Sequence, residues 1–112
     1  MHKHAINLAL VALFSMTVPL TAHSAEHVCV SQAKKRAHEL LSFHSDNDDR
    51  VAIDDEVKQI PGIRNPANRK QRFDVLEVWG YIYKGEYRMR LIYAQMPGCV
   101  LMGEEVLQHA SL

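Results

Sequence analysis

The first regular pattern of hydrophobic positions after residue 25 is helical. Between His27 and His44 the apolar residues stand at Cys29, Ala33, Ala37, Leu40 and Leu41. Their spacing of mostly three or four residues gathers them on one stripe of an α-helix, and charged side chains occupy the other sides. The polar run 45–49 that follows has turn-forming side chains, which predicts that the helix ends there.

Segments rich in β-branched and alternating apolar residues then predict strands. These segments are Val51–Ile60, Arg72–Lys84, Glu86–Gln95 and Cys99–Gln108. Pro61-Gly62 is expected to end the first strand. Lys84-Gly85 predicts a tight hairpin, because glycine supplies the positive φ angle that such a turn needs. Pro97-Gly98 predicts another turn, and the facing of the last strand stays open.

If Lys84 and Gly85 form a two-residue loop, the register of the two strands follows by counting outwards. Trp79 then lies opposite Arg90, and Tyr81 lies opposite Arg88. One face collects Leu76, Val78, Gly80, Ile82, Tyr87, Met89, Leu91 and Tyr93. A slip of one residue would scramble this coherent core face, which supports the register.

The order of these segments predicts the fold class. An N-terminal amphipathic helix followed by three or four antiparallel strands favours an α+β domain in which the helix covers one face of the sheet. Nothing in the sequence is left to cover the other face.

The N-terminus has the layout of a secretory signal peptide, residues 1–24. A short basic start precedes the apolar run Ala5–Leu20, and small residues follow up to Ala25. We expect cleavage near residues 24 and 25, which leaves residues 25–112 as a single domain. The apolar run includes Pro19 and polar residues and is shorter than the roughly 20 apolar residues of a membrane span, which argues against a permanent anchor. The sequence therefore predicts a periplasmic or secreted protein.

The mature chain contains two cysteines, Cys29 and Cys99. In an exported chain they allow one disulfide, which would close a loop of about 70 residues and tie the start of the helix to the last strand. The alternatives are a redox pair or a metal-binding pair, but the Cys-x-x-Cys spacing is absent.

Charge, possible metal ligands and catalytic motifs exclude several classes of function. The chain of 112 residues has 13 basic and 13 acidic residues, so it has no global field that would attract nucleic acid or anionic lipid. Acids gather between Asp46 and Glu56, but Arg50 and Val51 stand where a calcium-binding loop needs an oxygen ligand and glycine. The histidines are scattered, and we expect no metal and no cofactor. No nucleophile elbow, zinc-protease motif or phosphate-binding loop occurs in the sequence, which predicts that the protein is not an enzyme.

The candidate functional residues lie on the sheet face that the helix is not expected to cover. They are Glu77, Trp79, Tyr81, Tyr83, Arg88 and Arg90. Trp, Tyr and Arg dominate binding hot spots, and arginine stacked on an aromatic ring is itself favourable. We predict a recognition surface for a protein or peptide partner or for self-association; the alternative is that these pairs only stabilise a solvated sheet. A free sheet edge could also accept an extended peptide as an added strand.

Two rival functions remain open. One is a small-ligand carrier with a cavity near Gly80, between helix and sheet, where the missing side chain would leave room. The other is a structural subunit of an envelope assembly, which would never be monomeric.

One helix segment and three strand segments form a pattern: Ala33–Ala37, then Val75–Val78, Gly85–Tyr93 and Pro97–Leu101. This pattern resembles the small exported PepSY-type domains of bacteria, although the segment 46–68 is longer than the link in that family. The resemblance implies a helix packed on a short antiparallel sheet. It also implies a non-catalytic role in binding or in modulating a protease, such as the restraint of an envelope enzyme.

Overall fold

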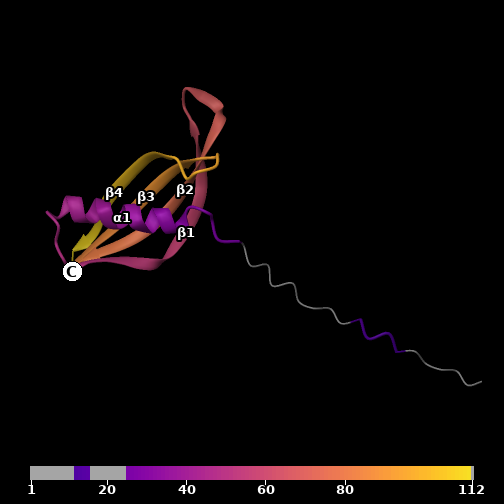
Figure 1. Cartoon of the computed structure of the whole chain (residues 1–112), viewed down its shortest axis with the longest axis horizontal. Coiled ribbons are helices and arrows are strands. Elements are labelled where there is room, and N and C mark those ends of the chain that lie inside the picture. Colours follow the sequence, from indigo (N-terminus) through magenta and orange to yellow (C-terminus); the bar gives the residue numbers. More distant parts are fainter. Residues whose placement is uncertain (1–11, 16–24, 112) are drawn as a thin grey trace, which may run out of the picture.

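The computed structural model describes residues 12–15 and 25–111. The predicted signal peptide and its cleavage site lie outside the described residues, apart from residues 12–15. The elements are α1 (Val30–His44), β1 (Val51–Asn65), β2 (Asn68–Ile82), β3 (Gly85–Ala94) and β4 (Leu101–Ser111). The strands form one antiparallel sheet in the order β1-β2-β3-β4, and α1 crosses one face of it (Figure 1). The predicted α+β class is confirmed.

The helix α1 packs on the sheet through a stripe of mostly small side chains. The fully buried residues of this stripe are Ala33, Ala37 and Leu41. The helix begins at Val30 and not at His27, because the His27 ring accepts the backbone N–H of Cys29 and holds the preceding residues in another conformation. It ends as predicted, where the Ser45 hydroxyl donates to the carbonyl of Leu41 at 2.7 Å.

Beneath the helix the sheet contributes the other half of the core. Its buried side chains are Leu76, Val78, Met89, Leu91 and Tyr93. Gly80 also lies beneath α1, and a Cβ atom added there would collide with the ends of the Leu41 and Met89 side chains. The cavity predicted near Gly80 is therefore wrong, because Leu41 fills the space that the missing side chain leaves.

The hairpin between β2 and β3 turns one residue earlier than predicted. Its loop is Tyr83–Lys84, and Ile82 pairs with Gly85. The predicted cross-strand pairs are therefore shifted by two positions, whereas the division of residues between the two faces is unchanged. The positive φ angle falls on Tyr83, at 53°, and not on Gly85. Glycine is needed at position 85 for space, because a Cβ atom there would lie 2.8 Å from the ring of Tyr87.

The strand β1 continues beyond the point at which the sequence predicted its end. Pro61 and Gly62 lie inside the strand, and a register shift accommodates them. Proline is tolerated because β1 is an edge strand and pairs on one side only. The strand β2 is also longer than predicted and starts at Asn68, not at Arg72. Together they form a long hairpin whose tip projects beyond the rest of the sheet (Figure 1).

A disulfide joins Cys29 to Cys99, as predicted. The sulfur atoms are 2.15 Å apart and the Cα atoms 5.6 Å apart. The bond connects the N-terminal end of α1 to the loop before β4. Contrary to the prediction, it does not reach the last strand itself, because β4 begins at Leu101 and not at Cys99. A disulfide of this kind indicates a location outside the cytoplasm. No helix in the described part of the chain is long and apolar enough to cross a membrane.

Loss of the disulfide should destabilise the domain. The bond spans a sequence separation of 70 residues. In the chain-entropy model such a loop contributes about 4 kcal/mol to the free energy of unfolding. We expect the C29A/C99A variant to lose about this amount in urea-induced unfolding. Reducing agent should lower the wild-type midpoint and leave that of the variant unchanged; equal midpoints in non-reducing buffer would contradict a stabilising role.

Candidate functional site

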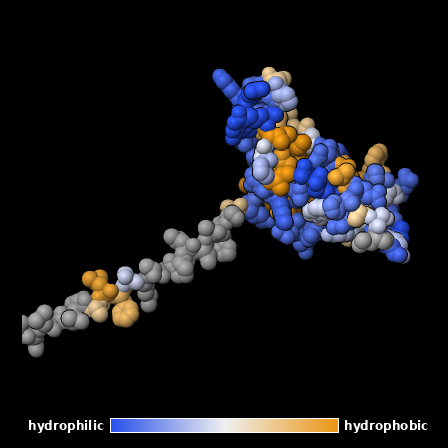
Figure 2. Space-filling view, turned by 180° about the vertical axis from the view of Figure 1, so that it is seen from behind, coloured by the Kyte–Doolittle hydropathy of each residue, from blue (hydrophilic) through white to orange (hydrophobic). Residues whose placement is uncertain are grey.

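Most of the predicted recognition residues lie together on the sheet face opposite α1. We call this set the outer-face cluster: Glu77, Trp79 and Tyr81 of β2, with Arg88 and Arg90 of β3. In the observed register Trp79 pairs with Arg88, and Glu77 pairs with Arg90. Figure 2 shows the molecule from behind, with this side of the sheet toward the viewer.

Hydrogen bonds connect the members of the cluster around one carboxylate. The indole Nε1–H of Trp79 donates to Oε1 of Glu77 at 3.1 Å. The Nε–H of Arg90 donates to Oε2 of the same carboxylate at 3.2 Å. Nη1 of Arg90 also lies 3.5 Å from a carboxylate oxygen of Glu105 on β4. The Glu77 side chain is only 12% exposed, and its two oxygens orient the side chains of Trp79 and Arg90.

This network replaces the predicted stacking of arginine on the aromatic rings. The cation–π contacts of the described residues are on Tyr83, whose ring centre lies 5.0 Å from Arg50 and 5.5 Å from Lys84. Tyr83 is in the hairpin loop and 69% exposed, so it stands apart from the outer-face cluster. Trp79 instead meets the ring of His109 edge to face, with the ring centres 5.1 Å apart.

Arg88 is the member of the cluster with an unmet hydrogen bond. Its Nε–H is buried and has no acceptor among the described residues. Its cross-strand neighbours are Trp79 on β2 and Leu107 on β4, and neither side chain offers an oxygen. A buried donor without an acceptor costs about 1–3 kcal/mol.

An apolar patch adjoins the outer-face cluster on the side of the β1–β2 hairpin. The register assigns to it Ile60, Ile63, Phe73, Val75 and Ile92. Val75 is only 3% exposed and Phe73 only 8%, because side chains of the neighbouring strands shelter them. Figure 2 shows a hydrophobic area on this side of the sheet, next to the hydrophilic hairpin tip. Contiguous apolar area on a protein surface is typical of interaction sites.

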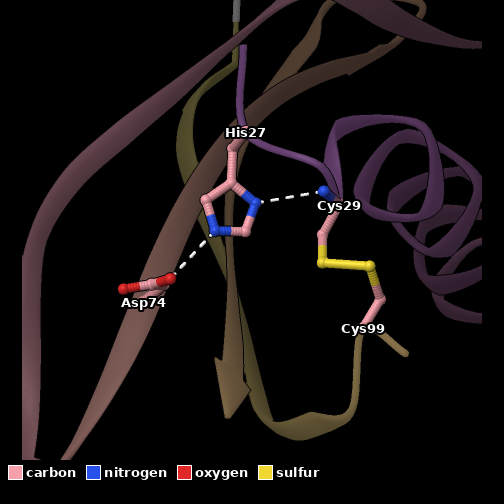
Figure 3. The surroundings of a disulfide bond; sticks show 4 residues. All are labelled: His27, Cys29, Asp74 and Cys99. Carbon is pink, nitrogen blue, oxygen red and sulfur yellow. Dashed lines mark hydrogen bonds and ion pairs between the residues drawn. A yellow bond between two sulfur atoms is a disulfide. The ribbon is translucent and has the colours of Figure 1, made fainter. Parts of the chain in front are cut away.

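A second polar site lies where the N-terminal segment meets the sheet (Figure 3). Nδ1 of His27 accepts the backbone N–H of Cys29 at 3.0 Å. In this arrangement Nε2 carries the ring proton, and it donates to Oδ2 of Asp74 at 2.9 Å. Gln95 donates to the other carboxylate oxygen, also at 2.9 Å. These hydrogen bonds hold the pKa of the Asp74 carboxyl below its usual value.

Sequence reasoning missed this site, although a signal for it existed. In the predicted register Asp74 falls on the core face, two residues before Leu76, where a carboxylate needs a partner. The site is not a catalytic cysteine centre. The His27 ring contacts the backbone N–H of Cys29, and the sulfur of that residue is engaged in the disulfide (Figure 3).

Two adjacent acids of β4 lie on opposite faces of the sheet, because side chains alternate along a strand. Glu104 points toward α1, where the Arg36 guanidinium donates to it through Nε at 2.7 Å and through Nη2 at 2.6 Å. This bidentate contact lowers the pKa of the Glu104 carboxyl. Glu105 points to the other face and reaches Arg90. Glu104 thus links β4 to α1, whereas Glu105 contacts the outer-face cluster.

Within residues 12–15 and 25–111, no three His, Cys, Asp or Glu side chains form a group that could hold a metal ion. No protein-family model, curated protein or solved structure matches this chain. The resemblance to PepSY-type domains therefore stays a prediction.

The contact of Asp74 with His27 should make the stability of the protein depend on pH. A carboxyl whose pKa is lowered by folding stabilises the fold above its unfolded pKa, and this contribution is lost as the pH falls through the folded pKa. We expect the D74N variant to be about 1 kcal/mol less stable than wild type at pH 7. Below about pH 4 the difference should shrink, because the Asp74 carboxyl of the unfolded wild type takes up a proton first and that of the folded protein follows only at lower pH. Urea unfolding at pH 7 and pH 3 measures this; an equal deficit at both would exclude a role for the charge.

Proposed function

We propose that this chain is an exported, non-catalytic binding protein that engages a protein partner through the outer-face cluster and the apolar patch. An N-terminal signal peptide would direct it to the periplasm or the medium, in keeping with its disulfide. The observation that carries the proposal is the bare sheet face. The helix α1 contacts β1, β2 and β3 on one side, and no element among the described residues covers the other side (Figure 1).

The chemistry of this face suits a binding hot spot. Hot spots combine aromatic and arginine side chains at the centre of a patch that excludes water. Trp79 and Arg90 are already oriented by Glu77, so a partner would not have to immobilise them on binding. Tyr81 is 38% exposed beside them, and the apolar patch continues the surface along the sheet. A role in restraining an envelope enzyme would accord with the PepSY-type resemblance.

Photo-crosslinking at Tyr81 tests the location of the binding surface. A photoreactive amino acid at this position, on the outer face, should capture a discrete partner in intact cells. The matched control is the same amino acid at Phe43, an aromatic residue of α1 that is 87% exposed. We expect no such adduct at Phe43. An identical adduct at both positions, or none at Tyr81, would sink the proposal, and an adduct with a second copy of the chain would assign the face to self-association.

Replacement of Arg88 separates binding from folding. The R88M variant removes a buried donor that has no acceptor among the described residues. We therefore expect its thermal stability to equal or exceed that of the wild type. Arg88 as a whole is only half-buried, so if its side chain contacts the partner, the yield of the Tyr81 adduct should fall at least about tenfold. The W79A/R90A variant should show the same loss, and undiminished capture by both folded variants is the result that would refute the proposal.

A further inference from the structure

The zero net charge of the chain hides two oppositely charged regions. Residues 57–73 hold five cations and no acid: Lys58, Arg64, Arg69, Lys70 and Arg72. Residues 46–56 hold six acids and one cation: Asp46, Asp48, Asp49, Asp54, Asp55 and Glu56, with Arg50. The structure separates the two regions further. Val51 at the start of β1 pairs with Ile82, whereas Asn65 at its end pairs with Asn68 at the hairpin tip.

The cations at the hairpin tip have no counter-charges. Arg64, Arg69, Lys70 and Arg72 are all exposed, and none forms an ion pair with any described residue. Arg64 lies directly opposite Arg72 in the strand register, and Lys70 lines a surface hollow together with Arg72. Like charges opposite one another on paired strands are destabilising. This arrangement therefore favours an external anion.

The tip also offers apolar side chains among its cations. Ile63 is 43% exposed on β1, and Met96 of the β3–β4 loop is 58% exposed. Met96 lines one surface hollow together with Lys70 and Arg72. Cations mixed with partly exposed apolar groups are typical of segments that lie at a lipid interface.

We propose that the tip of the β1–β2 hairpin docks end-on to the anionic phospholipid surface of a membrane. Arg64 and Arg72 pair across the two strands, Lys70 lines a surface hollow with Arg72, and Arg69 adjoins Asn68 at the hairpin tip. A flat surface met end-on reaches the cations of both strands together with the exposed Ile63 and Met96, and these apolar side chains favour a lipid interface over an acidic peptide. The acidic region lies at the opposite end of the strands and would point away from the lipid. Because charges are screened beyond about 8 Å at physiological ionic strength, it would not cancel the attraction.

This docking site lies apart from the outer-face cluster and shares only Ile63 with the apolar patch, so it adds to the proposed function and does not depend on it. Each cation near an anionic bilayer strengthens partitioning about fivefold. The full-length protein, as purified from the producing cells, is mixed with vesicles of phosphatidylglycerol and phosphatidylcholine in equal parts and sedimented. Vesicles of phosphatidylcholine alone report any binding that does not depend on lipid charge, including binding by the apolar run near the N-terminus.

The R64Q/R72Q variant should lose about 30-fold in its partition to the anionic vesicles. The matched control is K34Q/K35Q, which removes the same charge from α1, where neither lysine forms an ion pair with a described residue. It should keep wild-type binding within about twofold.

Several results would overturn the proposal. They include equal binding to both kinds of vesicle, unchanged binding of R64Q/R72Q, an equal loss in K34Q/K35Q, and binding to soluble polyglutamate in place of vesicles. Inorganic phosphate at matched ionic strength should displace no more protein than chloride does. Specific displacement would assign the arginine pair to free phosphate and would also count against a membrane.

Discussion

A single helix covers one face of a four-stranded sheet, and it can do so only by lying very close to the strands. The alanines of the helix stripe and Gly80, which receives the Leu41 side chain, allow this close approach. The bond between Cys29 and Cys99 then fixes the N-terminal end of the helix to the loop before β4. No second layer covers the opposite face among the described residues, so that face is held together by contacts among its own side chains. The hydrogen bonds around Glu77 are the clearest of these.

For the β2–β3 hairpin, the sequence predicts which face of the sheet each side chain occupies. It does not predict which residues lie opposite one another on the two strands. Side chains alternate with a period of two, so a shift of two positions leaves every residue on its predicted face. The choice of loop depends on whether Tyr83 accepts a positive φ angle, and its ring contacts Arg50 from outside the hairpin. The end of β1 was mispredicted for a similar reason. Pro61 breaks a central strand but is allowed at a sheet edge, and the edge position is known only from the assembled sheet.

All of the residues predicted for the bare face except Tyr83 lie together on it, but the contacts among them were not predicted. Alternation along β2 and β3 placed Trp79 and Arg90 on the bare face, but their shared partner Glu77 required the true register. The contact of His27 with Asp74 joins residues far apart in sequence and leaves only a weak local signal. The basic hairpin tip was missed because the net charge of the whole chain does not show where the charged residues lie.

The irregularity of β1 has a protective effect. A protein with a partly apolar sheet face risks polymerisation, because an exposed edge strand can template the addition of identical chains. In β1 the proline lacks one N–H group, and the register shifts interrupt the row of backbone donors and acceptors. Lys58 and Arg64 add repulsion between copies along the same strand. The longest exposed edge of the molecule is thus a poor seed for fibrils.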